Sequence, residues 1–366
     1  MAPDFPDIVQ HFCFEGEFLR AYPYGSGHIN DTYAAEFKKQ DGAEHRYLLQ
    51  RINHDVFRRP EELMENIESV IRHLKEKITS AGGDPQREAL CLIPTVSGGA
   101  FCKIAGASYW RAFILIEGAQ TYEVAETPQH VYHAARAFGS FQKLLADFPA
   151  ERLHETIPGF HHTPRRFEAF AGAVERDTAN RAQAVRPEID FVEQRLGDMS
   201  VLVDLLAQGL LPERVTHNDT KFNNVMIDDH TGEAVCVIDL DTVMPGSALY
   251  DFGDAVRAAA NTAPEDEQDL TKVIFDMETF DCLTHGYLDT SGEFLTQTEL
   301  DHLAFSARLM TLECGMRFLA DHLDSDTYFK IHRENHNLDR CRTQFKLVQE
   351  MESQFDQMLR IVDGFR

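Results

Sequence analysis

The sequence predicts an α+β protein built from two lobes, a small antiparallel β-sheet lobe at the N-terminal side and a larger helical lobe at the C-terminal side. Short runs of alternating apolar residues fill residues 17–115 of the 366-residue chain, and apolar residues at helical spacing fill most of the remainder. The character of the chain changes near 113–120. We therefore expect the lobes to cover 1–117 and 118–366.

Six strands and one helix are predicted in the N-terminal lobe. Each strand is a short apolar run bounded by glycine, asparagine or charged clusters, and the strands cover 18–24, 32–37, 46–50, 90–95, 101–104 and 109–116. Residues 59–79 carry apolar side chains at helical spacing, with Pro60 near the start and Gly82-Gly83 past the end. This order predicts an antiparallel sheet with one helix packed on it.

Helices dominate the predicted C-terminal lobe. Thr127-Pro128 combines a capping residue with a proline suited to the first helical position. Residues 163–208 are polar and favour helices. The capping box Thr296-x-x-Glu299 starts a helix that should reach about residue 323, and the apolar stripe over 337–362 predicts one last helix.

The composition restricts the classes of partner. With 60 acidic and 35 basic residues the net charge is −25, which argues against nucleic acid and anionic membranes as partners. There is no run of 18 apolar residues, and the first residues lack the pattern of a signal peptide. The seven scattered cysteines include no C-x-x-C and indicate reduced thiols in a cytoplasmic protein. Either a monomer or a small homo-oligomer fits these features.

The strongest chemical pattern lies in the segment 216–254. His217, Asp219 and Asn224 have the spacing H-x-D-x-x-x-x-N, and Asp239 follows a short apolar run. This order is typical of the catalytic loop and the metal-binding strand of kinases. A carboxylate such as Asp219 can orient and deprotonate an attacking hydroxyl group. The oxygens of Asn224 and Asp239 are of the kind that hold magnesium on nucleotide phosphates.

A β-hairpin would bring these residues together. Apolar runs over 225–227 and 235–238 flank a turn signal near 229–232. Folding at this turn would place the loop before the hairpin beside the carboxylate that follows it. The alternative is an ordinary polar loop, in which Asn and Asp serve as turn formers and helix caps.

Neighbouring polar residues have expected roles in this segment. We expect His217 to brace the loop by hydrogen bonds and Asp251 to stabilise it from within the fold. Lys221, two residues after Asp219, is placed to neutralise a transferring phosphoryl group, or else it is a solvated loop lysine. Asp241 would assist metal binding or cap the following turn.

A glycine-rich loop near the N-terminus is the candidate nucleotide site. Gly25 and Gly27 lie in G-S-G-H-I-N, between two predicted strands, where such a loop would cover the phosphates. A plain hairpin turn fits the same pattern.

The lysine that protein kinases use for the nucleotide phosphates is missing. At its strand position this chain has Gln50 or Arg51. Arg51 would contact phosphate, with Glu65 or Glu68 as its ion-pair partner, or would be a surface arginine.

Five blocks of the chain together resemble a known family. They are G-S-G-H-I-N-D-T-Y (25–33), T-H-N-D-T-K-F-N-N (216–224), I-D-L-D-T-V-M-P-G-S (238–247), L-E-C-G-M-R-F-L-A-D (312–321) and K-L-V-Q-E-M-E (346–352). With them the chain resembles the aminoglycoside phosphotransferase-like kinases, which include choline, homoserine and sugar kinases. More narrowly it is similar to bacterial N-acetylhexosamine 1-kinases. The resemblance implies a bilobal protein-kinase-like fold and the use of ATP and Mg²⁺.

The resemblance also implies a substrate and its contacts. The acceptor would be N-acetylglucosamine or N-acetylgalactosamine, phosphorylated on the anomeric hydroxyl with Asp219 as the base. Arg317 and Tyr328 match the family's sugar contacts. His28 could reach a bound sugar or a phosphate, and the resemblance favours the sugar; the alternative is an exposed loop histidine. A buried arginine is costly unless it is paired, so an ion pair of Arg317 with Glu313, four residues earlier, is the structural alternative.

Two other functions remain open at this point. The acceptor could be another hexose, an amino alcohol or an aminoglycoside. The chain could also be a nucleotide-sensing pseudokinase, which the missing lysine favours and the presence of Asp219, Asn224 and Asp239 opposes.

Overall fold

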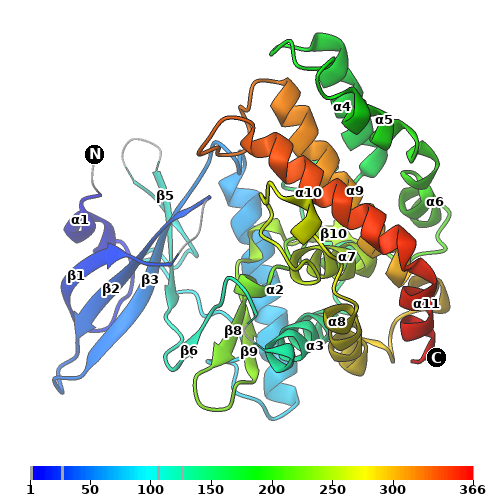
Figure 1. Cartoon of the computed structure of the whole chain (residues 1–366). Helices are drawn as coiled ribbons and strands as arrows, with labels where there is room; N and C mark the ends of the chain where they lie inside the picture. Colours follow the sequence, from blue (N-terminus) through cyan, green and yellow to red (C-terminus); the bar gives the residue numbers. More distant parts are fainter. Residues whose placement is uncertain (1–2, 26–28, 105–107, 126, 366) are drawn as a thin grey trace.

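The computed structural model describes residues 3–25, 29–104, 108–125 and 127–365, and it has two lobes (Figure 1). A five-stranded antiparallel sheet forms one lobe, and helices build most of the other. This confirms the α+β bilobal fold that the sequence predicts.

The sheet of the N-terminal lobe has the strand order β1-β2-β3-β5-β4, with each neighbouring pair antiparallel. Its strands are β1 (Glu17–Pro23), β2 (Asp31–Lys38), β3 (Glu44–Ile52), β4 (Cys102–Ile104) and β5 (Ser108–Ile114). The short helix α1 (Phe5–Val9) precedes β1 and contacts it. The register of β3 and β5 places Gln50 opposite Arg111, so both side chains lie on the same face.

The strand predicted over 90–95 is wrong. Leu92 and Thr95 form only isolated bridges to other segments. Pro94, between them, has no N–H to donate, so a regular ladder cannot continue through it.

Helix α2 (Pro60–Ser80) connects the two lobes. Its buried face includes Leu63, Ile67 and Val70. The expected packing on the sheet alone is incomplete, because the hydrophobic cluster around α2 also contains Phe141 and Val215 of the helical lobe. One core therefore extends from the sheet into the second lobe.

The chain enters the helical lobe between β5 and β6. The two-residue strand β6 (Ala119–Gln120) already pairs with β8 (Val225–Asp228) of that lobe. A lobe boundary between 117 and 118 fits this crossing and remains a proposal, since one core is shared across it.

The helical lobe also contains short strands. Its helices are α3 (Pro128–Leu144), α4 (Thr163–Arg176), α5 (Arg186–Glu193), α6 (Val201–Ala207), α7 (Ala248–Ala259), α8 (Met277–Ser291), α9 (Gln297–Leu323), α10 (His336–Ser353) and α11 (Phe355–Asp363). Besides β6 and β8, its strands are β7 (Arg214–Thr216), β9 (Ala234–Val237) and β10 (Met244–Gly246). Helix α9 is central, since it packs against α4, α7 and α10.

Two predictions for the helices have different outcomes. The capping box between Thr296 and Glu299 is present at the start of α9, as predicted. The single helix predicted over 337–362 is wrong, because the backbone of Gln354 leaves the helical region (φ −115°, ψ 11°) and separates α10 from α11. Among the described residues, none of the helices has the length and hydropathy required to cross a lipid bilayer.

Candidate active site

The hairpin of β8 and β9 gathers the residues of the H-x-D-x-x-x-x-N pattern. Val225 pairs with Val237, and the Ile238 N–H donates to the Asn224 carbonyl oxygen at 2.9 Å. Asn224 is therefore next to the chain that leads into Asp239. Its side-chain amide donates to the Asp219 carbonyl oxygen at 2.8 Å and to Asp219 Oδ2 at 3.1 Å.

Asp251, at the start of the buried helix α7, holds the loop from within the fold. Its carboxylate accepts the backbone N–H groups of His217 at 2.9 Å and Asn218 at 2.7 Å, and the Gln142 amide at 2.5 Å. His217 Nε2 in turn lies 2.9 Å from the Ile238 carbonyl oxygen. The expected bracing role of His217 and the structural role of Asp251 are confirmed.

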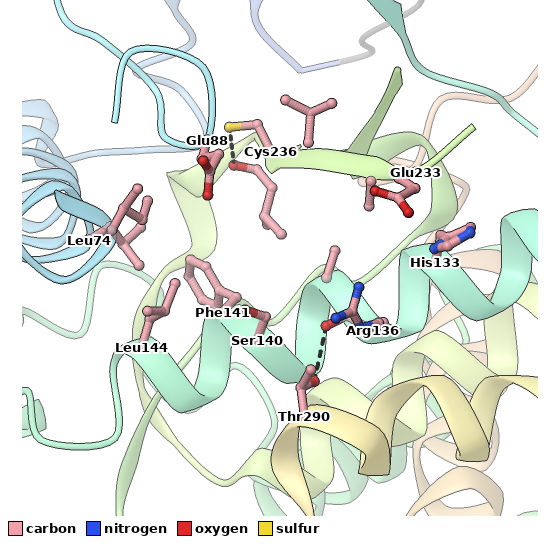
Figure 2. Close-up of a pocket in the computed structure, with 15 residues that line it drawn as sticks. Leu74, Glu88, His133, Arg136, Ser140, Phe141, Leu144, Glu233, Cys236 and Thr290 are labelled. Atoms are coloured by element: carbon pink, nitrogen blue, oxygen red, sulfur yellow. Dashed lines mark hydrogen bonds between the residues drawn. The ribbon is translucent and has the colours of Figure 1, made fainter. Parts of the chain in front are cut away.

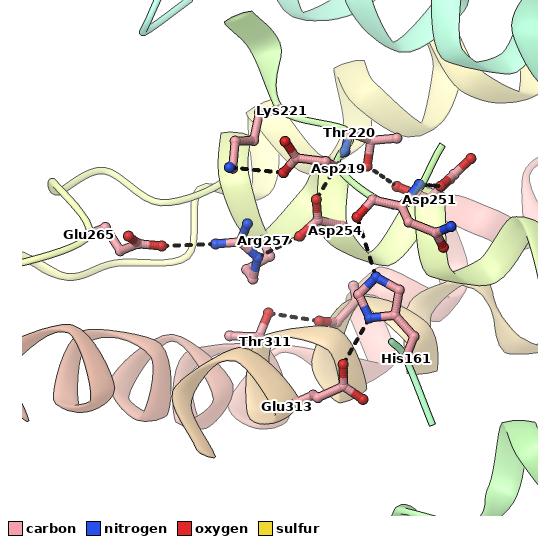
Figure 3. Close-up of polar contacts among 12 residues, drawn as sticks. His161, Asp219, Thr220, Lys221, Asp251, Asp254, Arg257, Glu265, Thr311 and Glu313 are labelled. Carbon is pink, nitrogen blue, oxygen red and sulfur yellow. Dashed lines mark hydrogen bonds and ion pairs between the residues drawn. The ribbon is translucent and has the colours of Figure 1, made fainter. Parts of the chain in front are cut away.

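A series of polar contacts leads from the Asp219 loop to helix α7 (Figure 3). Lys221 Nζ lies 2.8 Å from Asp219 Oδ1, and this carboxylate raises the pKa of the Lys221 ammonium. The Thr220 N–H donates to Asp254 at 3.0 Å, and Asp254 pairs with Arg257 at 2.8 Å. Buried residues of α7 thus fix the backbone directly after Asp219, and the sequence pattern does not identify them.

The carboxylate of Asp239 is left without a partner. Its side chain reaches solvent, and no hydrogen bond or ion pair to it is formed within the described part of the chain. Although the side chain reaches solvent, the dense protein around its carboxylate removes part of its hydration. This desolvation, together with the negative charges of Asp241 and Asp219, raises the pKa of Asp239 to about 7. A cation at this position would relieve that repulsion.

The oxygen donors fit magnesium better than they fit a zinc-type site. Among the described residues, no group of three His, Cys, Asp or Glu side chains is placed to hold a metal. Asp239 and the amide oxygen of Asn224 would supply part of an oxygen shell. Magnesium usually takes its remaining ligands from water and substrate phosphates.

The substitution Asp239→Asn tests this electrostatic description. It removes a carboxylate that two others repel, so we expect the metal-free variant to unfold at the same or a higher temperature than the wild type. We also expect its affinity for a nucleotide triphosphate to be nearly independent of added Mg²⁺. Differential scanning calorimetry and titration calorimetry with EDTA or Mg²⁺ measure both. A clear loss of stability, or an unchanged response to Mg²⁺, would contradict the assignment.

A buried contact between His161 and Glu313 attaches α9 to the loop that carries Asp219. His161 Nδ1 lies 2.8 Å from Glu313 Oε1, and its Nε2 lies 3.4 Å from the carbonyl oxygen of Asn218 (Figure 3). Thr163 donates to the second Glu313 oxygen at 2.7 Å. Although burial opposes ionisation, the contacts of His161 and Thr163 with Glu313 hold the pKa of that carboxyl below its ordinary value.

Arg317 lies one helical turn after Glu313 and lacks an ion-pair partner within the described residues. Its guanidinium stacks over the rings of Phe160 and Phe329 at 5.2 and 5.6 Å. The structural alternative, an ion pair with Glu313, is not formed, because both Glu313 oxygens are used by His161 and Thr163. Arg317 is therefore available to a ligand.

Arg166 and Tyr328 belong to the same region. The guanidinium of Arg166 lies 5.6 Å from the Phe160 ring, and burial and the charge of Arg317 lower its pKa. Tyr328 is exposed beside Phe329. The structure thus brings the predicted acceptor residues Arg317 and Tyr328 near one another and adds Arg166, which has no motif around it.

The candidate nucleotide residues have separate environments. Arg51 pairs with Asp31 on the neighbouring strand, with both side chains about half exposed, and Glu65 instead contacts His154 at 2.7 Å. The expected pairing of Arg51 with Glu65 or Glu68 is wrong, because the strand register puts Asp31 directly opposite. The predicted Gly27 and His28 lie outside the described residues, and Gly25 has a left-handed backbone (φ 76°) that suits glycine.

Asp241 joins the two lobes. Arg111 Nη1 donates to Asp241 Oδ1 at 2.5 Å, and Asn30 Nδ2 donates to Asp241 Oδ2 at 2.5 Å. Both oxygens accept from the N-terminal lobe, and within the described residues Asp241 does not cap the following turn. Its assistance in metal binding stays a prediction. Gln50 lies beside this group and accepts from Arg111 Nε at 3.0 Å.

One cavity lies apart from these groups and another lies beside them. One of about 350 Å³ is bounded by α2, α3 and β9, with Phe141 and Cys236 among its lining residues (Figure 2). Another of about 230 Å³ has Phe160, His161 and Asn218 among its lining residues. Of the residues that the structure describes, neither Asp219 nor Arg317 lines either cavity.

The two-lobed fold fits a kinase-like phosphotransferase, and Asn224 contacts Asp219 as the sequence pattern leads us to expect. The profile of the phosphotransferase enzyme family matches residues 21–278, more than half of the chain, and the chain belongs to this family.

Solved structures agree with this fold over nearly the whole chain. An aminoglycoside phosphotransferase from Alicyclobacillus acidocaldarius is 12% identical, with a TM-score of 0.63 over 100% of this chain and 97% of that chain. A microcompartment-associated aminopropanol kinase is 15% identical, with a TM-score of 0.60 over 96% of both chains. An amicoumacin kinase in complex with AMP-PNP and Ca²⁺ is 14% identical, with a TM-score of 0.59 over 92% and 90%. At these identities the likeness establishes the fold.

Proposed function

We propose that the chain is an ATP- and Mg²⁺-dependent kinase that phosphorylates the anomeric hydroxyl of N-acetylhexosamines, with N-acetylglucosamine or N-acetylgalactosamine as acceptor. The family supports phosphoryl transfer, and a structural neighbour in complex with AMP-PNP and Ca²⁺ supports a nucleotide and a divalent cation. Seven free cysteines are consistent with a cytoplasmic enzyme.

The observation that carries the choice of acceptor is the unpaired charge of Arg317. Glu313 is bridged through His161 to Asn218, so Arg317, one turn farther along α9, is held near the catalytic loop. With the phenol of Tyr328 it offers hydrogen bonds to hydroxyl and acetamido groups. An acceptor that lacks these groups would form fewer hydrogen bonds with the two side chains and would bind more weakly.

The positive charges of Arg166 and Arg317 argue against acceptors that carry an amine. An aminoglycoside or an amino alcohol carries positive charge and would meet the like charges of Arg166 and Arg317. N-acetylation removes that charge from a hexosamine. A kinase for another small hydroxyl compound remains the second candidate, because structural neighbours include an aminopropanol kinase.

The proposed reaction needs little covalent help from the protein. Asp219 accepts the proton of the anomeric hydroxyl and orients that oxygen for in-line attack. Asn224, hydrogen-bonded to Asp219, fixes the position of the base relative to the metal-binding residue Asp239. A bound magnesium ion would offset charge on the phosphate oxygens. Lys221, paired with Asp219 in this structure, is placed to add positive charge at the transferring group.

A panel of acceptors tests the proposal. We expect ADP release with N-acetylhexosamines to exceed that with unmodified hexoses, amino alcohols and aminoglycosides, and we expect an acid-labile 1-phosphate as product. Arg317→Met should raise KM for the N-acetylhexosamine at least about tenfold, as for loss of a hydrogen bond to a charged donor.

Arg308→Met is the matched control on the same helix. Arg308 pairs with Asp198 and Glu352 away from the catalytic loop, so its loss should leave KM unchanged. Preference for an amine acceptor, or equal effects of the two variants on KM, would exclude the N-acetylhexosamine assignment.

A further inference from the structure

Gln50 is one of the two β3 positions at which a kinase would place its phosphate-binding lysine, and a cation lies opposite it on the neighbouring strand. Arg111 stands directly opposite Gln50 in the register of β3 and β5. Its Nε donates to Gln50 Oε1 at 3.0 Å, so the guanidinium occupies the surroundings of the missing lysine.

Arg111 is buried and bound on two sides. The residue is 2% exposed, and its Nη1 donates to Asp241 Oδ1 at 2.5 Å. Within the described part of the chain, the remaining nitrogen, Nη2, has no acceptor. This nitrogen is not one of the fully buried polar atoms that lack a partner, so it keeps a donor that a ligand oxygen can accept.

Asp241 fixes the position of the Arg111 guanidinium. Asp241 lies two positions after Asp239, in the short turn that follows β9, and its other oxygen holds Asn30 at the end of the glycine-rich loop. The guanidinium is thus close to the metal-binding carboxylate and to the loop over the phosphates.

We propose that Arg111, held by Gln50 and Asp241, supplies the positive charge to the nucleotide phosphates that the β3 lysine supplies in protein kinases. Its supporting carboxylate comes from the segment that carries Asp239, whereas protein kinases take theirs from a helix of the N-terminal lobe. A planar guanidinium suits this position, because it can bind Gln50, Asp241 and a phosphate oxygen through different nitrogens.

This inference rests only on the nucleotide part of the proposed function, so binding can test it without an acceptor. Titration calorimetry with Mg²⁺ and AMP-PNP is compared with adenosine, which lacks phosphates. We expect Arg111→Met to weaken AMP-PNP binding at least about tenfold and to leave adenosine binding within about threefold. If the wild type does not bind AMP-PNP, the proposed function fails. If Arg111→Met binds it as the wild type does, this inference alone fails.

A second variant distinguishes a binding role from a structural one. Arg111→Met combined with Gln50→Lys restores a cation at the usual position, and we expect it to recover most of the lost AMP-PNP affinity. If Arg111→Met alone does not fold, the AMP-PNP and adenosine affinities of the double variant decide the proposal. Near-wild-type affinity supports the proposal, and a phosphate-specific loss overturns it. If the double variant also fails to fold, Arg111→Lys decides by the same comparison.

Arg214→Met is the matched control. Arg214 forms a similarly buried ion pair with Glu299 at 2.6 Å within the helical lobe. Its loss should lower the melting temperature and leave the ratio of AMP-PNP to adenosine affinity unchanged. The same ratio in Arg111→Met and Arg214→Met would mean that Arg111 only stabilises the fold.

Discussion

Replacing Asp219 by asparagine should lower kcat by at least about a hundredfold while the protein stays folded, in line with removal of a general base. The asparagine keeps the size of the side chain and can still contact Asn224, but it cannot accept the acceptor's proton. The lost ion pair with Lys221 is partly exposed, and exposed pairs contribute little to stability. Initial rates at saturating nucleotide and acceptor, with a melting curve beside them, measure both effects.

Two companion variants make this result specific. Lys221→Met removes the other half of the ion pair. If Lys221→Met and Asp219→Asn lose kcat to a similar extent, the loss comes from the missing charge at the phosphoryl group and not from a missing base. Asp228→Asn changes a carboxylate at the end of β8 and should keep normal kcat. Wild-type turnover by the Asp219 variant would end its role as base.

Asp251→Ala should affect both stability and turnover. The carboxylate is 1% exposed, and its removal leaves the N–H groups of His217 and Asn218 and the amide of Gln142 without an acceptor. Each unsatisfied buried donor costs about 1–3 kcal/mol, so we expect a loss of at least about 3 kcal/mol in the free energy of unfolding. Asp219 follows Asn218 directly, and a shift of about 1 Å there would lower kcat about a hundredfold.

Urea unfolding and steady-state kinetics below the melting temperature separate these two effects. Asp228→Ala is the control, since that carboxylate, at the end of β8, also accepts two backbone N–H groups, those of His230 and Thr231, and pairs with Arg87. It should lose stability and retain kcat. An Asp251→Ala enzyme with unaltered kcat would show that the loop keeps its geometry without this brace.

Features that depend on neighbouring residues could be predicted from the sequence. The hairpin that follows Asn224 needs only two apolar runs and a turn, and the capping box at Thr296 needs only a partner three residues later. The break at Gln354 could not be predicted, because the apolar stripe continues across it and tertiary packing decides where the helix ends.

Contacts between residues far apart in the sequence could not be predicted. Arg111 and Asp241 are 130 positions apart, and His161 and Glu313 are 152 apart. The one available signal was a lone arginine in the apolar run of β5, where an unpaired charge is costly and a partner must exist. The partner's identity required the fold. For the same reason the roles of Asp219, Asn224, Asp239, Arg317 and Tyr328 as base, metal ligands and acceptor contacts remain predictions.

The backbone around the chemical groups has a consequence for protein engineering. Asn218, just before Asp219, and Asp239 both have positive φ angles, of 64° and 59°. Asn and Asp tolerate this region better than most residues, and β-branched or bulky side chains do not. Variant libraries for higher thermal stability should therefore leave Asn218 and Asp239 unchanged. A residue that relaxes the positive φ angle at either position would shift the side chains on which turnover depends.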